Sequence, residues 1–141
     1  MSRRKHRRVA VCGSRSFPLT TEVAAQVVEL LRGYPAGTVF LTRGSAGFDE
    51  FVLAVCGLLD LPCEALPSAG GSANWDRDVA MVRAADEVVV FLDPDTLTDE
   101  NTGTAHVLAK ALDQRKKAMA YSASGDRLVY VGSSDYEGVA G

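Results

Sequence analysis

Short apolar runs alternate along the chain with segments whose apolar residues recur at helical spacing. The runs that predict strands are residues 9–12, 38–42, 62–66, 88–92 and 117–121. The segments with apolar side chains at i, i+4 and i+7 predict helices over residues 20–32, 48–59, 74–85 and 102–114. Strands alternating with helices form βαβ units. The pattern therefore predicts a three-layer α/β domain, with a parallel sheet of about five strands and helices on both faces.

The same pattern predicts which side chains enter the core. In the third predicted helix, Trp75 shares a spacing with Val79 and Val82, and in the fourth, Leu112 lies on the stripe that begins at Val107. The uniformly apolar run 88–92 is typical of a central parallel strand covered on both faces. A last strand over residues 128–131 would form a C-terminal hairpin with its predecessor through residues 124–126.

Glycine-rich and hydroxyl-rich segments follow the predicted strands. They cover residues 13–17, 43–49, 68–72 and 93–104. In an open parallel sheet, ligands bind at the carboxyl ends of the strands, where glycine lets the backbone approach a ligand and helix N-termini bind phosphate. We therefore expect a phosphate-bearing ligand at this edge. The residues of the first two segments that we expect to contact it are Gly13, Ser14, Arg15, Arg43, Gly44, Ser45 and Gly47.

Three arginines fall near this edge. Arg15 and Arg43 lie in the first two loops, where a guanidinium group can bind a phosphate in a bidentate way or can pair with one of the nearby acids. Both interpretations stay open. Arg77 lies in the first turn of the third predicted helix, beside the positive end of the helix dipole. That position predicts an anionic partner, either Asp78 or the ligand.

Charge is unevenly distributed over the 141 residues. The net charge of −3 comes from 15 basic and 18 acidic residues, but five of the basic residues lie in the first eight positions. From Val9 onward, 10 basic residues face all 18 acidic ones, a net charge of −8. An acidic body disfavours duplex DNA as a partner. We interpret residues 1–8 as a disordered basic leader, 9–132 as a single domain and 133–141 as a frayed tail.

The composition indicates where in the cell the protein is located. No apolar run approaches the roughly 20 residues that a membrane span needs, and the apolar run after the leader is too short for a signal peptide. The three cysteines lack CxxC spacing, which disfavours a disulfide framework and a cysteine zinc site. We therefore expect a cytoplasmic protein without a membrane partner and without a metal site of its own.

Four motifs occur in an order that resembles a known family. They are Gly13-Ser14-Arg15 with Phe17, then Gly44 to Asp49, then Arg77-Asp78 with Met81, and finally Gly103-Thr104. Together they resemble the YspA-like proteins (the DUF2493 group) of the SLOG superfamily of modified Rossmann folds, over about residues 9–121. The ordered set is more specific than any one motif.

The resemblance implies a nucleotide or nucleotide-derived ligand, such as AMP or an ADP-ribose-like molecule. It adds Asp49, as a contact to a ribose hydroxyl, and Arg77, Gly103 and Thr104 to the predicted pocket. Members of the superfamily include N-glycosidases that cleave nucleoside monophosphates, proteins thought to sense nucleotides in phage–host or stress systems, and the DprA branch, which binds single-stranded DNA. Family members are often homodimers.

The chain departs from the hydrolase motif Pro-Gly-Gly-x-Gly-Thr-x-x-Glu of the LOG phosphoribohydrolases. The double glycine before Gly103 is missing, and Val107 stands at the position of the catalytic Glu. Glycosidic cleavage needs a carboxylate, which valine does not supply. We therefore expect sensing or sequestration of the ligand. The alternative is an N-glycosidase that uses Arg77 and Glu100, and a single-strand binder ranks third.

Several residues keep two interpretations. Asp49 suits the positive end of a helix dipole as well as a ribose. Trp75 could stack a base, although its spacing favours the core. His106 could face the ligand as an acid–base group or simply be solvated. The acidic loop that contains Asp93 and Glu100 could be solvated, act as a lid, or hold Mg²⁺ together with ligand phosphates.

Overall fold

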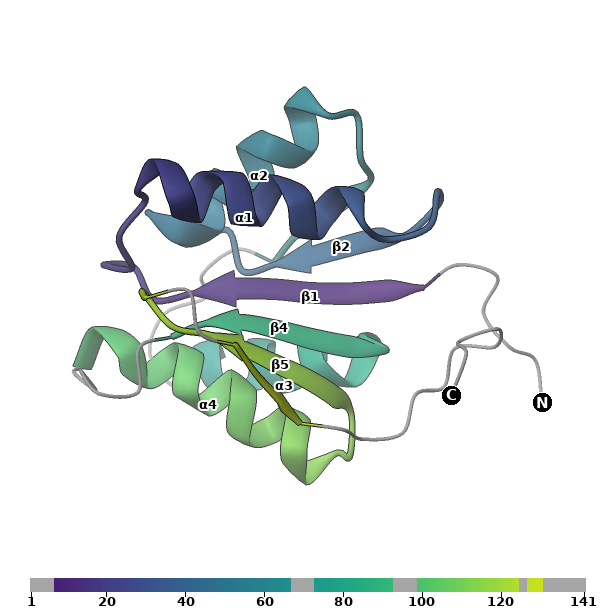
Figure 1. Cartoon of the computed structure of the whole chain (residues 1–141). Helices are drawn as coiled ribbons and strands as arrows, with labels where there is room; N and C mark the ends of the chain where they lie inside the picture. Colours follow the sequence, from purple (N-terminus) through teal and green to yellow (C-terminus); the bar gives the residue numbers. More distant parts are fainter. Residues whose placement is uncertain (1–6, 67–72, 93–98, 125–126, 131–141) are drawn as a thin grey trace.

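A computed structural model describes residues 7–66, 73–92, 99–124 and 127–130. These residues form a six-stranded sheet with four helices (Figure 1). The strands are β1 (Arg8–Gly13), β2 (Val39–Thr42), β3 (Cys63–Ala65), β4 (Glu87–Phe91), β5 (Lys117–Tyr121) and β6 (Arg127–Tyr130). The helices are α1 (Thr21–Arg32), α2 (Phe48–Leu58), α3 (Ala73–Ala84) and α4 (Asp99–Asp113).

The sheet has the strand order β3-β2-β1-β4-β5-β6. β1 to β5 are parallel, and β6 pairs antiparallel with β5, so both the predicted parallel sheet and the C-terminal hairpin strand are confirmed. The order reverses at β1, because β2 and β3 lie on one side of it and β4 and β5 on the other. The gap between the carboxyl ends of β1 and β4 is therefore the switch point at which such folds bind ligands.

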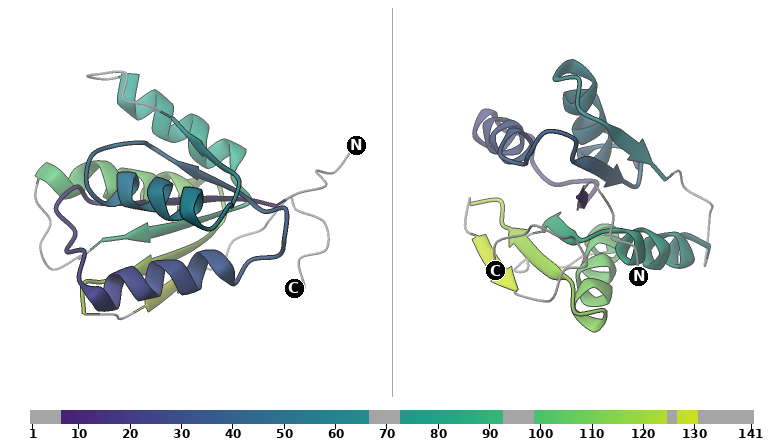
Figure 2. Two further views of the ribbon diagram at one scale, coloured as in Figure 1. Left: turned by 90° about the horizontal axis from the view of Figure 1, so that it is seen from above. Right: turned by 90° about the vertical axis from the view of Figure 1, so that its right-hand side faces the viewer.

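Helices cover both faces of the sheet. α1 and α2 lie on one face, and α3 and α4 lie on the other (Figures 1 and 2). Alternation along β1 divides its side chains between the two cores: Val9 and Val11 pack with α1 and α2, whereas Ala10 and Cys12 pack with α3 and α4. The chain therefore has the three-layer Rossmann-like architecture that its hydrophobic pattern predicts.

Four features differ from the predictions. Trp75 is 47% exposed and Leu112 is 42% exposed, so neither is a core residue. Trp75 packs on His106 of α4 rather than on the sheet, and Leu112 lies beside the buried stripe that contains Val107. α4 begins at Asp99, about one turn earlier than expected, and β1 begins at Arg8 within the segment assigned to the leader.

An aromatic cluster underlies the carboxyl end of β1. The ring of Phe48 lies 4.5 Å from that of Phe91 and 5.6 Å from that of Phe17, measured between centroids. Gly13 lies against this cluster, and a Cβ atom on Gly13 would come within 2.5 Å of the Phe48 ring. Phe48 is fully buried, so the ring or the backbone must shift to accommodate a larger residue here. The packing therefore favours glycine at the end of this strand.

None of the described helices is both long enough and apolar enough to cross a membrane.

We expect Gly13→Ala to destabilise the fold by about 1–3 kcal/mol, because the added methyl group overpacks the Phe48 ring. Gly57→Ala is the matched control. A Cβ atom at Gly57, within α2, meets nothing within 4 Å, so this substitution should stabilise the protein by about 0.5–1 kcal/mol through helix propensity. Urea denaturation measures both changes, and equal effects would contradict the packing argument.

Candidate functional site

The guanidinium group of Arg43 is buried directly after β2 and binds three other segments. Its Nε donates to Oδ2 of Asp49 at 2.8 Å. Its Nη2 donates to the carbonyl oxygen of Gly13 at 2.7 Å and to Oγ1 of Thr104 at 3.0 Å. One side chain thereby joins the end of β2 to the end of β1, the first turn of α2 and the second turn of α4.

Asp49 completes this network. It is fully buried, and its second oxygen, Oδ1, accepts a hydrogen bond from the backbone N–H of Gly13 at 2.9 Å. Burial opposes the charge on Arg43, but the neighbouring groups Cys12, Asp49 and Asp78 raise its pKa above the usual value. The Arg43 guanidinium group is therefore charged, and Asp49 lies against it inside the protein. Burial also raises the pKa of the Cys12 thiol to about 12, so this thiol stays protonated.

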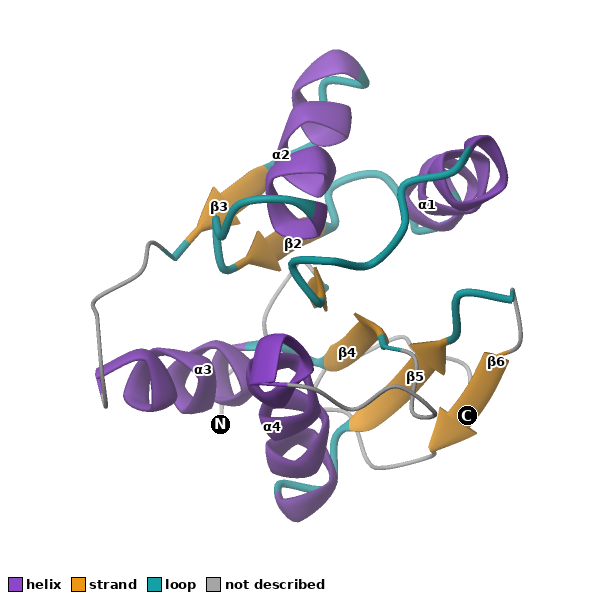
Figure 3. Cartoon of the chain, turned by 90° about the vertical axis from the view of Figure 1, so that its left-hand side faces the viewer, coloured by secondary structure: helices purple, strands orange, loops and turns teal. Residues whose placement is uncertain are grey.

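The first two glycine loops are in contact at the carboxyl edge (Figure 3). Gly47 has φ of +84°, and a Cβ atom there would clash with the carbonyl oxygen of Arg15. Ser14 donates its backbone N–H to Phe91 at the end of β4, which places this loop at the switch point. The Ser14 hydroxyl is buried and has no hydrogen-bond partner among the described residues, whereas Arg15 is exposed.

The other wall of this edge comes from α3 and α4. Arg77 donates from Nε and Nη2 to Oδ1 of Asp78, at 3.1 and 2.9 Å. The imidazole Nδ1 of His106 lies 3.7 Å from Oδ2 of Asp78. Within the described part of the chain, Nη1 of Arg77 and Nδ1 of His106 are buried without a hydrogen-bond partner. The anionic partner of Arg77 in the structure is therefore Asp78, and the imidazole of His106 lies next to this pair.

The structure brings together most of the predicted residues in two groups. Gly13, Arg43, Asp49 and Thr104 form the buried network, and a Cβ atom on the adjacent Gly103 would lie 3.1 Å from Nη1 of Arg43. Ser14, Arg15, Gly44, Ser45 and Gly47 form the contacting loops. Arg77 belongs to the α3–α4 wall. Whether any of them binds a ligand stays a prediction.

Some predictions fall on parts of the chain that the structure does not describe. The side chain of Glu100 and the segments 67–72 and 93–98 are outside the described residues. The proposed Mg²⁺ contacts of Asp93 lie there too. Among the side chains that are described, no group of three His, Cys, Asp or Glu residues is arranged to hold a metal ion.

Sequence reasoning missed two relationships at this site. It assigned Asp49 to the helix dipole or a ribose, whereas the carboxylate binds both Arg43 and the backbone of Gly13. It also placed Trp75 in the core, whereas its ring rests on His106. The six-residue separation of Arg43 and Asp49, across a strand end and a helix start, is a signal for the first pair. No local pattern indicates the second.

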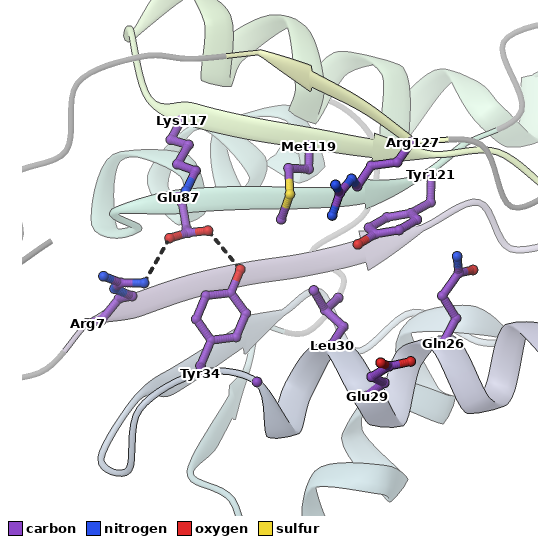
Figure 4. A pocket seen from close by; sticks show the side chains of 11 residues that line it. Arg7, Gln26, Glu29, Leu30, Tyr34, Glu87, Lys117, Met119, Tyr121 and Arg127 are labelled. Atoms are coloured by element: carbon purple, nitrogen blue, oxygen red, sulfur yellow. Dashed lines mark hydrogen bonds and ion pairs between the residues drawn. The ribbon is translucent and has the colours of Figure 1, made fainter. Parts of the chain in front are cut away.

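A separate groove of about 540 Å³ lies between α1 and the strands β4, β5 and β6 (Figure 4). At one end of it, Glu87 accepts a hydrogen bond from the Tyr34 hydroxyl at 2.7 Å and pairs with Nη1 of Arg7 at 3.3 Å. Burial, followed by the charge of Glu87, raises the pKa of Tyr34 above its usual value. None of the residues predicted to bind the ligand lines this groove, so it is distinct from the glycine-rich edge.

Comparisons with known proteins identify the fold but no family. No family model matches the chain, and no curated protein matches it either. Among solved structures, the chain is similar to DNA processing protein A (DprA) from Streptococcus pneumoniae, with a TM-score of 0.67 and 13% sequence identity. The match covers 83% of this chain and 50% of the DprA chain. The chain thus has a DprA-like Rossmann fold and spans about half the length of that protein.

We expect Arg43→Met to destabilise the protein by about 3–5 kcal/mol, because it leaves the Asp49 carboxylate buried without its counter-charge. Arg83→Met is the control, since Arg83 is an exposed residue in the last turn of α3. Its effect should stay within about 0.5 kcal/mol. Chemical denaturation of the two variants gives the comparison, and a similar small loss in both would contradict a structural role for the pair.

Stability should also depend on the protonation of His106. Burial lowers the pKa of His106 below its usual value, although Asp78 partly offsets this effect. Because the unfolded state then takes up the proton at a higher pH than the folded state, stability falls as the pH drops below about 6.5. We expect the parent protein to lose more stability between about pH 7.5 and 5.5 than His106→Gln does. Urea unfolding at each pH tests this, and identical pH profiles would refute it.

Proposed function

We propose that the protein binds a small phosphate-bearing nucleotide or nucleotide-derived ligand, such as AMP or an ADP-ribose-like molecule, and acts by sensing or sequestering it. The observation that carries the proposal is the contact between the loops that contain Arg15 and Gly47, at the switch point of the sheet. Ligands of open α/β sheets bind at such points. The buried hydroxyl of Ser14, with no partner among the described residues, is a donor for a ligand oxygen there.

The start of α2 is suited to a phosphate group. Gly47 precedes the helix and has no side chain to cap its first N–H groups. Glu50 donates its backbone N–H to the carbonyl oxygen of Ser45 at 3.0 Å, so the N–H groups of Phe48 and Asp49 and the positive end of the helix dipole are the features that favour an anion. Asp49 lies in the same turn, but Arg43 compensates its charge, so the carboxylate does not repel a ligand strongly. Arg15 is exposed at the adjacent loop and supplies a cation that can reach the phosphate.

Binding fits the chain better than hydrolysis does. Val107, at the position of the hydrolase Glu, is fully buried in the core with Ala111. A carboxylate is needed to activate water, and a buried valine supplies none. We further propose that the chain belongs to the YspA-like group of the SLOG superfamily and acts in the cytoplasm as a homodimer, with Mg²⁺ as an optional companion of the phosphate.

Single-stranded DNA is the competing ligand, because the structural neighbour is a DNA processing protein. Phosphate contacts along a strand need a basic surface, and the chain after residue 8 carries a net charge of −8 from 10 basic and 18 acidic residues. A compact ligand with one or two phosphate groups needs fewer basic side chains for binding. We therefore favour the small nucleotide.

A thermal-shift panel tests the proposal. We expect AMP or ADP-ribose to raise the melting temperature, because each would bind only the folded state. Arg15→Ala should reduce the shift without lowering the melting temperature of the free protein, since Arg15 is exposed. Arg32→Ala, at an exposed site in the last turn of α1, is the control and should leave the shift unchanged.

Two further measurements separate the alternatives. Release of free base from nucleoside monophosphates would show the N-glycosidase activity and refute a purely binding role. A salt-sensitive shift with a single-stranded oligonucleotide, and none with mononucleotides, would favour the DNA ligand instead. No shift with any nucleotide would refute the proposed function.

A further inference from the structure

Trp75 is the single tryptophan of the chain and packs on α4 beside the Arg77–Asp78 pair. Its ring is about half exposed, although it belongs to the first turn of α3, two residues before Arg77. It packs against His106, with 3.7 Å between the ring centroids and an angle of 58° between the ring planes. One side of the indole is therefore supported by the protein, and much of the rest of its surface faces solvent.

Trp75 and Arg43 both contact the second turn of α4, through His106 and Thr104 respectively. His106 lies two residues after Thr104 on α4, and Thr104 accepts a hydrogen bond from Arg43 at 3.0 Å. Arg43 in turn donates to the carbonyl oxygen of Gly13, where the first loop begins. Burial has the largest effect on the pKa of both Cys12 and Arg43, and Asp78, which pairs with Arg77, also raises both pKa values, so Asp78 is within electrostatic range of the end of β1. The first turn of α3 thus packs against the same turn of α4 that Arg43 contacts.

The surroundings of the indole favour a neutral aromatic partner. Burial lowers the pKa of His106, so the imidazole against the ring is uncharged at neutral pH. Arg77 is held by Asp78 at 2.9 Å and does not present a free cation to the ring. Nδ1 of His106 is buried and has no hydrogen-bond partner among the described residues. The wall therefore offers an aromatic surface, whereas the glycine loops offer N–H groups.

We infer that Trp75 is the platform on which the base of the bound nucleotide stacks, with the phosphate held at the loops of Arg15 and Gly47. The inference rests on the proposed function and makes it narrower: the ligand is a nucleotide with its base attached, not a sugar phosphate. Aromatic side chains stack with every base through their π-faces, and an exposed indole provides the largest such surface in a protein. Trp75 then determines affinity for the base and not for the phosphate.

Fluorescence of the parent protein gives a direct measurement, because the chain contains one tryptophan. We expect AMP to quench this emission and ribose 5-phosphate to leave it nearly unchanged. Both ligands should raise the melting temperature, since both carry the phosphate. Binding of AMP and ribose 5-phosphate with no difference in emission would overturn the stacking inference and leave the proposed function in place.

Calorimetric titration of three variants completes the test. Trp75→Ala should weaken AMP binding about 5- to 150-fold and leave ribose 5-phosphate binding unchanged. Trp75→Phe, which retains an aromatic face, should recover most of the AMP affinity. Leu58→Ala is the control for loss of an exposed apolar side chain, because Leu58 is 87% exposed at the end of α2, and it should change neither affinity.

The outcomes distinguish the two proposals. Equal weakening of both ligands in Trp75→Ala would mean that the indole only supports the fold, which would overturn the inference. An unchanged AMP affinity in that variant would overturn it as well. If neither ligand binds the parent protein, the proposed function fails, and the inference fails with it.

Discussion

The carboxyl edge of the sheet depends on one buried ion pair. Arg43 and Asp49 are both removed from water, so each needs the other, and each also needs the remaining bonds that its atoms can make. Those bonds reach the backbone of Gly13 on both its N–H and C=O groups, and the hydroxyl of Thr104. The geometry of one pair thereby fixes where β1 ends, where α2 begins and how closely α4 approaches. This network also positions the loops next to these elements.

The sequence predicts the features that depend on local periodicity. Alternation along β1 separates Val9 from Ala10 onto opposite faces, and Thr20 caps α1 by accepting from the N–H of Val23 at 3.2 Å. Features that depend on a partner from a distant segment are not predictable in this way. The spacing of Trp75 gives its side of the helix but not what stands opposite, which is His106 and solvent. The partners of Arg43 depend on how β2 packs with β1, α2 and α4 in the folded chain.

The site separates residues that build it from residues that face outward. The Arg43–Asp49 pair is internal, whereas Arg15 and Trp75 are exposed. The acidic residues are likewise divided between the interior and the surface. Asp49 and Asp78 are buried with arginine partners, and Asp86 accepts a hydrogen bond from the backbone N–H of Arg8 at 2.8 Å. Part of the negative charge is therefore used inside the fold and does not face an approaching anion.

The shortness of β3 has a consequence for behaviour at high concentration. Edge strands present unpaired backbone groups that can template the addition of another chain, and long flat edges are sites of aggregation. β3 (Cys63–Ala65) is three residues long, and the charged Glu64 at its centre is exposed. This edge offers few backbone groups and places a carboxylate among them. The sheet is thus protected on that side from strand-by-strand growth into fibrous assemblies.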